Sequence, residues 1–312
     1  MAFVNLKDGS ENRRISNHTV LCLGNFDGVH KGHRALISAV KDEKNRLKSQ
    51  FSDIMAGAWL FNVSPLHYLQ DDFKAITDTN QKLEIFKELS LDFVFLADFK
   101  ELCSISPADF IHNILEKKCN CVSAVCGYNY HFAKDGAGDA EYLKTNFRGN
   151  TIVISPVTIN DIAVSSTIIR ALIKDGKISE ANSLLERPFT ISASIEHGFH
   201  LGTSLGFPTI NQTFHDELIV PHFGVYISKS IIDGKTYNSI TNIGIRPTVS
   251  GSERINCETF ILDFHNNIYG EIVSVQLLEF LRNEHKFEDI SALKNQIQDD
   301  VLGAKKYFAY EK

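Results

Sequence analysis

The chain has 312 residues, about twice the roughly 150 residues of a typical single domain, which predicts two domains. Hydrophobic residues make up 43% and charged residues 22%, so disordered and fibrous classes are excluded and each domain can form a sizeable core. The formal net charge of −6 leaves no overall basic field for a nucleic-acid backbone. Any anionic ligand must therefore be held by a local site.

The sequence carries no sign of a membrane segment or a secretion signal. No apolar run approaches the roughly 18 residues that a spanning helix needs, and the N-terminus lacks an apolar core with a cleavage pattern. We therefore expect a cytoplasmic protein without a membrane partner. Six cysteines are too few for a disulfide scaffold, and Cys119, Cys121 and Cys126 lack paired CxxC spacing, so buried thiols are favoured over a metal site.

Strand-like apolar runs alternate with helical spacing up to about residue 186, which is typical of parallel βαβ units. The expected strands are Thr19–Leu23, Asp53–Phe61, Asp92–Ala97, Val122–Cys126 and Ile152–Pro156. The expected helices are His33–Lys48, Thr79–Leu89 and a helical pair within Ser165–Leu185. This half is predicted to be an α/β domain with a parallel sheet.

From Pro188 onward the apolar period changes to two, with a strong hairpin signal at Asp233-Gly234. The expected strands are Phe189–His197, Val225–Ile232, Lys235–Ile243, Cys257–Phe264 and Ile272–Phe280. A last segment, Asp289–Phe308, has helical spacing with Asp289 as its N-cap. We expect a small antiparallel β-barrel with a terminal helix, and domain limits of 1–186 and 187–312.

The segment LGNFDGVHKGHRALI, residues 23–37, follows an expected strand and opens an expected helix. Glycines 24, 28 and 32 allow the backbone to approach a ligand, and the N–H groups of a helix start attract anions. His30 and His33 at the junction can donate hydrogen bonds to phosphoryl oxygens. A tight turn with two solvated histidines is the alternative.

A second segment, VSSTIIR at residues 164–170, begins the next expected helix. Ser165, Ser166 and Thr167 supply three hydroxyl groups, and Arg170 follows one turn later on the same side. Such a group can hold a pyrophosphate, although a simple N-cap explains the segment taken alone. Together, the two segments suggest the halves of a nucleotide clamp.

These motifs resemble the nucleotidyltransferase superfamily, and more closely the N-terminal adenylyltransferase domain of bacterial riboflavin kinase–FAD synthetases. The resemblance implies a Rossmann-like fold in which FMN phosphate attacks the α-phosphorus of ATP and pyrophosphate leaves. It implies that His30, His33 and Arg170 act on the phosphates. The implied ATP- and phosphate-binding positions are Gly24, Asn25, Phe26, Asp27, Gly28, Ser165, Ser166 and Thr167.

Two segments depart from that family pattern. Residues 61–67 read FNVSPLH where an F-x-P-H-P type motif is usual. Residues 127–139 read GYNYHFAKDGAGD, with Asn129 in place of an aspartate, Ala133 in place of a glycine, and no arginine before the last glycine. Because both segments help place the flavin and the nucleotide in the family, with Asn129 as the implied flavin contact, adenylyl transfer can be slowed, retuned or lost.

In the second half, the segment GTSLGFPTIN at residues 202–211 offers Gly202 and Gly206 for a close loop over phosphates. Thr209 and Asn211 offer oxygen ligands to a hard cation, although a Gly-Pro turn between strands is the usual meaning of such a segment. Glu258 shares a strand face with Phe260 and other apolar residues, so we expect it to point inward with a raised pKa, as suits a general base. A solvated glutamate is the alternative.

This half resembles the riboflavin kinase domain. The resemblance implies that Thr209 and Asn211 bind Mg²⁺, that Gly202, Gly206 and Pro208 belong to the ATP element, and that Glu258 activates the riboflavin 5′-hydroxyl. The N-x-G-x-R-P-T element at 242–248 and the segment 280–287 match as well, with Arg246, Arg282 and Phe287 as implied flavin contacts. Leu201 and Thr203 replace residues that are commonly basic.

The two resemblances together predict a bifunctional enzyme that phosphorylates riboflavin to FMN and then adenylylates FMN to FAD. The expected partners are the small molecules riboflavin, FMN and ATP with Mg²⁺, and the expected state is a monomer or weak homo-oligomer. One alternative is a riboflavin kinase with a weak or inactive adenylyltransferase domain. Another is a non-catalytic regulatory protein that binds flavin or nucleotide. A cytidylyl- or pantetheine-type transferase would explain the first domain alone.

Overall fold

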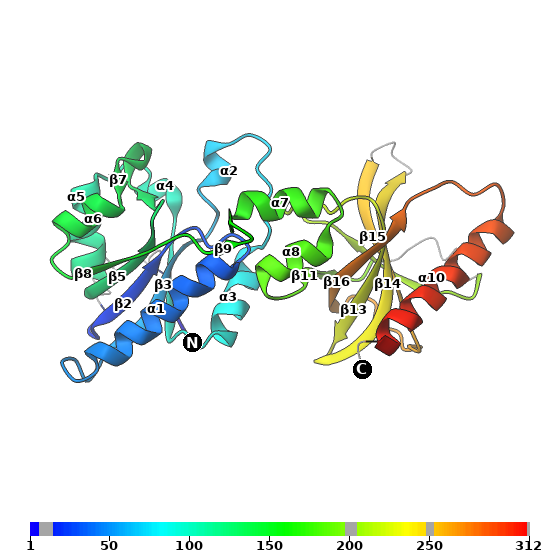
Figure 1. The fold of residues 1–312 in the computed structure, drawn as a ribbon, viewed down its shortest axis with the longest axis horizontal. Helices are drawn as coiled ribbons and strands as arrows, with labels where there is room; N and C mark the ends of the chain where they lie inside the picture. Colours follow the sequence, from blue (N-terminus) through cyan, green and yellow to red (C-terminus); the bar gives the residue numbers. More distant parts are fainter. Residues whose placement is uncertain (6–14, 197–204, 248–252, 311–312) are drawn as a thin grey trace. The chain divides into compact units, whose positions relative to one another are not determined.

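The computed structural model describes residues 1–5, 15–196, 205–247 and 253–310, and the chain forms two compact units (Figure 1). The first unit is Met1–Ser166 and the second is Thr167–Lys312. No helix in the described part of the chain is long and apolar enough to cross a membrane.

The first unit contains one six-stranded sheet in which every pair of neighbouring strands is parallel. In spatial order the strands are β1 (Ala2–Asn5), β4 (Phe93–Ala97), β3 (Met55–Phe61), β2 (Thr19–Leu23), β5 (Cys121–Gly127) and β8 (Asn150–Ile154). The predicted α/β fold with a parallel sheet is confirmed, while the short edge strand β1 has no counterpart among the expected strands.

Helices cover both faces of this sheet, because its residues alternate between two apolar cores. Helices α1 (Lys31–Leu47) and α3 (Thr79–Glu88) pack on the face that includes Val20 and Cys22. The other face, with Leu21 and Leu23, is covered by α6 (Ala140–Asn146) and by η1 (Phe110–Lys118), a segment of π-helical geometry. The shorter elements are α2 (Leu66–Leu69), α4 (Phe99–Leu102), α5 (Pro107–Asp109), β6 (His131–Phe132), η2 (Lys134–Gly136), β7 (Gly138–Asp139), β9 (Thr158–Ile159) and β10 (Ile162–Ala163).

Strand β2 lies between β3 and β5, so the chain leaves it toward one side of the sheet and later returns to build the other. Ligands of open parallel sheets bind beyond the carboxyl ends of the strands at such a reversal of strand order. The loop after Leu23, which carries the glycine–histidine segment, therefore lies at the position that this architecture offers to a ligand.

A buried carboxylate fixes α1 to two strands. Glu43 Oε1 accepts hydrogen bonds from Ser123 Oγ (2.9 Å) and Asn150 Nδ2 (3.1 Å), and Glu43 Oε2 accepts from Arg46 Nε (2.6 Å). The Glu43 side chain is only 4% exposed. The hydrogen bonds from Arg46, Asn150 and Ser123, led by Arg46, lower the pKa of this carboxyl to about 2.

The second unit is a barrel of antiparallel strands preceded by two helices, α7 (Ser166–Lys174) and α8 (Ile178–Leu185), of which α7 begins at the last residue of the first unit. The strands in spatial order are β11 (Phe189–Ser194), β16 (Ile272–Asn283), β13 (Gly224–Ile232), β14 (Lys235–Pro247), β15 (Glu253–Ile261) and β12 (Thr209–Thr213). The first and last strands are joined by a bond from Gln212 Nε2 to the carbonyl of Ala193 and, just past the end of β11, by a bridge between Glu196 and Asn211. A second bond from Gln212 Nε2 reaches the carbonyl of Val273 on β16. The predicted antiparallel barrel is confirmed.

The interior of the barrel contains a continuous chain of hydroxyl groups. Thr241 Oγ1 lies 2.8 Å from Ser228 Oγ and 2.9 Å from Thr259 Oγ1, and all three side chains are buried. The terminal helix α10 (Ile290–Tyr310) packs outside the barrel, where Ala304 and Phe308 contact a small apolar core. The members that the strands contribute to this core are Val225, Ile227 and Ile240.

We expect Glu43→Gln to lower the free energy of unfolding by roughly 2–3 kcal/mol at pH 7, because the folded state holds this carboxyl ionised. The folded pKa of about 2 lies below the ordinary 4.5, so the contribution is present above pH 4.5 and is lost as the pH falls toward 2. Urea unfolding at several pH values measures it, and the variant should respond less steeply to acid.

Glu84→Gln is the matched control, because Glu84 is 69% exposed and lies 3.6 Å from Lys87 Nζ on the surface of α3. Its effect should stay within about 0.5 kcal/mol. Equal losses in the two variants would contradict the role given to Glu43.

Candidate active sites

The loop after β2 has an unusual backbone that its buried side chains hold in place. Phe26 (φ 51°), Gly28 (φ 79°) and Val29 (φ 41°) are in the left-handed region, which non-glycine residues seldom adopt. Phe26 and Val29 are fully buried, so their packing offsets this strain. His30 then caps α1 in an extended conformation, and the helix starts at Lys31 with its first N–H groups at the carboxyl edge of the sheet.

The two predicted histidines lie together at this helix start. The imidazole rings of His30 and His33 are stacked, with centroids 3.8 Å apart and planes 19° apart. Gly32 makes room for this arrangement, since a Cβ atom there would lie 3.1 Å from His30 Cε1. Two adjacent imidazoles beside helix N–H groups can stabilise the charge of a phosphate chain.

Asp27 holds the loop from within. Its buried carboxylate accepts hydrogen bonds from the backbone N–H of Ile76 (2.8 Å) and Thr77 (3.4 Å), and Gly28 N–H donates to Thr77 Oγ1 (3.0 Å). Ser166 Oγ donates to the Asp27 carbonyl (2.8 Å). The structure therefore brings Ser166 to the glycine–histidine loop, and it gives the Asp27 side chain a part in holding the loop.

A buried lysine that no sequence pattern indicates lies behind this loop. Lys82 on α3 is 3% exposed, and burial lowers its pKa, while the charges of Asp27 and Asp78 oppose that shift. A lysine within a helical apolar stretch gives no signal that distinguishes it from a surface residue.

Thr167 and Arg170 belong to the second unit, where Arg170 Nη2 lies 3.4 Å from Thr167 Oγ1 on α7. A hydroxyl and a guanidinium thus stand together, as the motif predicted. Their grouping with His30 and His33 stays a prediction, as does the part of Ser165.

The first departing segment, residues 61–67, lies at the same edge of the sheet because it directly follows β3. The buried Ser64 donates from Oγ to Asn25 Oδ1 (3.2 Å), so the segment contacts the loop that carries Gly24 and Asn25. His67 packs edge-on against Phe73, with ring centroids 4.9 Å apart.

The second departing segment, residues 127–139, follows β5 and forms the β6–β7 hairpin. Ala133 stands there with φ 65° and ψ −170°, a conformation that suits glycine and strains other residues. The replacement of the family's glycine by Ala133 is thus a strained one. Asn129 is exposed near the start of this segment.

In the barrel, the pairing of three strands aligns the predicted kinase residues. Asn211 on β12 lies opposite Glu258 on β15, and Glu258 lies opposite Asn242 on β14. Directly opposed residues of antiparallel strands point to the same face, so these side chains form one row. Asn256 Nδ2 lies 3.1 Å from Asn211 Oδ1 and 3.0 Å from Glu258 Oε1.

The expectation that Glu258 points inward was wrong. Its neighbours Cys257 and Thr259 face the barrel interior and are fully buried, whereas Glu258 lies on the opposite, partly exposed face. The apolar residues that suggested the inward face include Phe260, which packs against Phe207 with ring centroids 5.5 Å apart. The argument for a raised pKa through burial among apolar residues therefore does not hold.

The same face explains the glycine of the N-x-G-x-R-P-T element. A Cβ atom at Gly244 would overlap the carboxylate of Glu284, which accepts a hydrogen bond from Asn242 Nδ2 (3.0 Å). The absence of a side chain at Gly244 thus lets Glu284 lie beside the row of Asn211, Glu258 and Asn242.

Parts of the second predicted site lie outside the described residues. These are Gly202, Leu201, Thr203, Thr248 and the side chain of Arg246. Of the remaining ATP element, Gly206 has φ 91°, which favours glycine, and Pro208 is exposed just before β12. The segment around Thr209 was interpreted as a ligand loop or as a turn between strands, and the structure shows that strand β12 begins at Thr209.

Arg282, a predicted flavin contact, makes an ion pair with the buried Asp300 on α10, with Nη2 2.7 Å from Oδ2. Its guanidinium carbon lies 5.9 Å from the ring centre of Phe287. The structure brings these two predicted residues together, and it shows that Arg282 also fastens α10 to β16.

Thr209 and Asn211 offer a hydroxyl and an amide oxygen from one face of β12, the hard donors that Mg²⁺ prefers. The described residues contain no group of three or more His, Cys, Asp and Glu side chains that could hold a metal ion. The two donors fit Mg²⁺, which they would hold together with oxygens that the substrates supply.

The three clustered cysteines are buried, as predicted. Burial raises the pKa of Cys121 to about 12 and that of Cys126 to about 11, and it raises the pKa of Cys119 as well. Thiols with such pKa values stay protonated at neutral pH and are poor nucleophiles.

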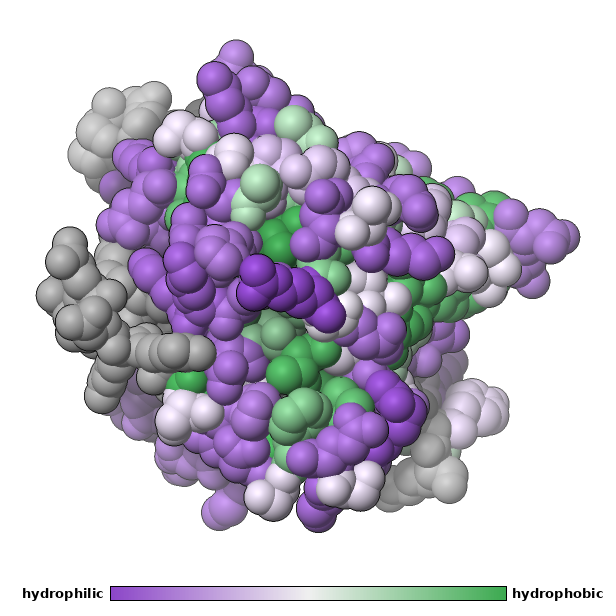
Figure 2. Space-filling view, turned by 90° about the vertical axis from the view of Figure 1, so that its left-hand side faces the viewer, coloured by the Kyte–Doolittle hydropathy of each residue, from purple (hydrophilic) through white to green (hydrophobic). Residues whose placement is uncertain are grey.

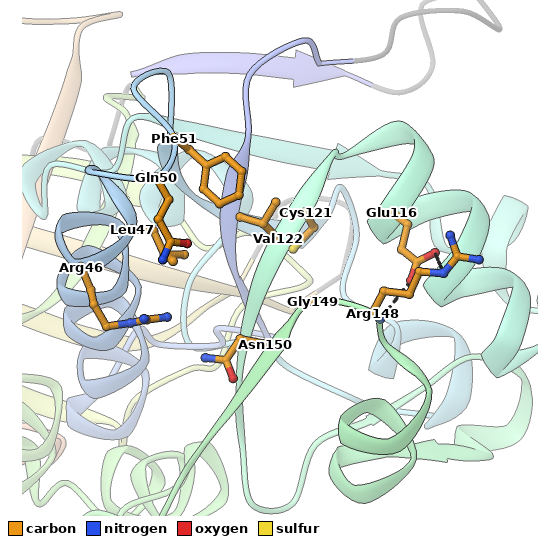
Figure 3. Close-up of a pocket in the computed structure, with 10 residues that line it drawn as sticks. All are labelled: Arg46, Leu47, Gln50, Phe51, Glu116, Cys121, Val122, Arg148, Gly149 and Asn150. Atoms are coloured by element: carbon orange, nitrogen blue, oxygen red, sulfur yellow. Dashed lines mark hydrogen bonds and ion pairs between the residues drawn. The ribbon is translucent and has the colours of Figure 1, made fainter.

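A pocket of about 500 Å³ lies at the other edge of the sheet, near the end of α1 and the starts of β5 and β8 (Figure 3). Arg46 and Asn150 line it, and both are held by Glu43. Since α1 begins at the carboxyl edge and ends at this one, the pocket is not part of either predicted site. Figure 2 shows that the face on the left-hand side of Figure 1 is largely hydrophilic, with small apolar areas.

Comparison with known proteins gives a match to each half of the chain. The FAD synthetase family matches residues 12–168, and the riboflavin kinase family matches residues 185–308. Proteins named bifunctional riboflavin kinase/FMN adenylyltransferase are similar over nearly the whole chain. That of Listeria monocytogenes is 31% identical, covering 93% of this chain and 92% of its own, and that of Escherichia coli K12 is 32% identical, covering 94% of each.

A solved structure has a closely similar fold. A crystal structure from Streptococcus pneumoniae, named as a macrolide-efflux protein, matches with a TM-score of 0.88 and 29% identity. The match covers 98% of this chain and 99% of that one.

We expect Ala133→Gly to stabilise the first unit by about 1 kcal/mol, because glycine adopts φ 65° and ψ −170° without strain. Urea denaturation measures the change. Ala137→Gly, in the same segment, is the control: Ala137 is exposed with φ −67°, so glycine there should destabilise by about 0.5–1 kcal/mol. Destabilisation by Ala133→Gly would contradict the strain assigned to this residue.

Proposed function

The chain belongs to the bifunctional riboflavin kinase/FMN adenylyltransferase family, and we propose here which of its residues carry out each reaction. Its C-terminal domain phosphorylates riboflavin with ATP, and its N-terminal domain adenylylates FMN to FAD. The observation that carries the kinase assignment is the row of Asn211, Glu258 and Asn242 across three paired strands. We take residues 1–186 and 187–312 as the two domains.

In the kinase reaction, Glu258 accepts the proton of the riboflavin 5′-hydroxyl as its oxygen attacks the γ-phosphorus of ATP, and ADP leaves. Its place on a partly exposed face supports this role, because a substrate can reach it. Thr209 and Asn211 would hold Mg²⁺, which neutralises charge on the transferred phosphoryl group when it is bound. Gly206 and Pro208, with Gly202, cover the ATP phosphates.

In the second reaction, an oxygen of the FMN phosphate attacks the α-phosphorus of ATP, and pyrophosphate leaves. His30 and His33 donate hydrogen bonds to the phosphate chain beside the N–H groups of α1. Ser166, which is bonded to the loop, begins the second half of the clamp, and Ser165, Thr167 and Arg170 extend it. The loop of residues 24–28 contacts the ATP phosphates, and Asp27 holds this loop through its bonds to the backbone of residues 76 and 77.

The flavin is held by Asn129 in the first domain and by Arg246, Arg282 and Phe287 in the second. The nearness of the Arg282 guanidinium to the Phe287 ring supports a joint contact with a planar ligand. We further propose that the protein is a monomer or weak homo-oligomer.

A second candidate is a riboflavin kinase whose adenylyl transfer is weak. The strained Ala133 favours this candidate. It lies in the segment that helps to place FMN and the nucleotide in the family, and it stands where the family has a glycine.

We expect purified protein with ATP and Mg²⁺ to convert riboflavin to FMN and then to FAD, and to release pyrophosphate when FMN is supplied directly. Chromatography of the flavins and a pyrophosphate assay measure both steps. Accumulation of FMN without any FAD from either starting flavin would select the second candidate.

The two sites should be separable by single substitutions. Glu258→Gln keeps the size of the side chain but removes the base, so FMN formation should fall at least 100-fold while FAD formation from FMN persists. His33→Ala should do the reverse, because it removes a phosphate contact in the other domain. Rates of each half-reaction measured on both variants test this, and undiminished FMN formation in Glu258→Gln would refute the assignment of the base.

A further inference from the structure

The side chain of Asn256 connects Asn211, which we propose binds the cation, with Glu258, which we propose accepts the proton. Asn256 lies on β15 two residues before Glu258, so both point to the same face of the sheet. Its Nδ2 atom lies 3.0 Å from Glu258 Oε1 and 3.1 Å from Asn211 Oδ1 on the neighbouring strand. Asn256 itself is 7% exposed.

These two contacts use the full donor capacity of the amide. A carboxamide nitrogen carries two hydrogens, and here one is donated to each acceptor. A buried amide whose two N–H groups are both hydrogen-bonded is held rigidly. The loss of either acceptor would leave one buried N–H group unpaired, which costs free energy. The geometry of Asn256 thus couples the side-chain torsions of Asn211 and Glu258 to one another.

The bonds also determine which atom each partner presents. Because Asn256 donates, the atom of Asn211 that faces it is the amide oxygen, the same type of atom that a hard cation requires. Glu258 has several rotatable bonds, and a fixed Oε1 restricts the positions that its carboxylate can take. Reactions whose barrier depends on the placement of a base and a phosphate are sensitive to such restriction.

We propose that Asn256 is a positioning residue of the kinase reaction, which holds Glu258 and Asn211 in one mutual geometry by donating a hydrogen bond to each. This inference rests on the proposed roles of Glu258 and Asn211. In this role Asn256 contacts neither riboflavin nor ATP and acts only through its two partners.

Two substitutions test the role from different directions. Asn256→Leu has a similar shape but no donor, and Asn256→Asp has the same shape but turns an acceptor toward two acceptors. We expect both to lower kcat for riboflavin phosphorylation by about 10- to 100-fold, with KM for riboflavin changed less than about threefold. Asn256→Gln, which keeps both donors on a longer arm, should recover part of the lost kcat.

Three controls separate positioning from folding. Adenylylation of FMN by the same preparations should be unchanged, because it belongs to the other domain. Asn238→Asp, at an exposed asparagine on β14, should leave kcat within about twofold. Crystal structures of the Asn256 variants should show Glu258 or Asn211 in a different side-chain rotamer, a readout that does not depend on activity.

A double substitution gives the sharpest outcome. If Asn256 acts through Glu258, adding Asn256→Leu to Glu258→Gln should cost less than about threefold beyond Glu258→Gln alone. Full kcat in both Asn256→Leu and Asn256→Asp, when Glu258→Gln is inactive, would overturn the inference and leave the kinase proposal intact. Activity retained in Glu258→Gln would instead overturn the kinase proposal. Loss of the folded barrel in all three Asn256 variants would make the residue structural and would also overturn the inference.

Discussion

The register between strands β12 and β15 determines whether the C-terminal domain has a site at all. It sets Asn211 opposite Glu258, and a slip by one residue would turn every side chain of β12 to the other face of the sheet. The register is secured from both sides, because Glu196 N–H donates to the Asn211 carbonyl (2.8 Å) and Gln212 bonds to two carbonyls inside the barrel. Closure of the barrel and alignment of the site therefore have the same cause.

The N-terminal domain uses buried charge for a similar purpose. The loop from Phe26 to Val29 is strained, and a strained loop persists only where the surroundings hold it. Asp27 supplies that hold through the backbone of Ile76 and Thr77, and the buried Lys82 interacts electrostatically with Asp27. The start of α1, where we propose that phosphates bind, is thus held in place by buried side chains.

Sequence patterns predicted this fold well where apolar periodicity decides it. Strand Thr19–Leu23 and the helix that follows are obtained almost to the residue, because a buried strand and an amphipathic helix each have a clear period. Strand β12 was missed because its residues, TINQT, are mostly polar and follow a glycine and a proline. Strand β1 is only four residues long and pairs with a strand that comes about 90 residues later.

The error over Glu258 has a more general physical reason. Apolar neighbours usually mark the inward face of a strand, but the inward face of β15 carries Thr259, whose buried hydroxyl is satisfied by that of Thr241 on β14. Inward and outward faces were therefore exchanged in the interpretation of β15. Contacts such as those of Asn256 depend on register and cannot be read from one strand's pattern.

The outer face of the barrel changes from apolar to polar along its length. Apolar residues of the strands that do not fill the interior must be covered, and α10 covers Ile240 together with Val225 and Ile227. Along β14, Asn242 and Gly244 follow Ile240 on the same face, so the surface changes from apolar to polar beyond the helix. The ion pair between Arg282 and Asp300 fastens α10 to β16. The face that carries the proposed base is thus apolar where α10 covers it and polar farther along β14.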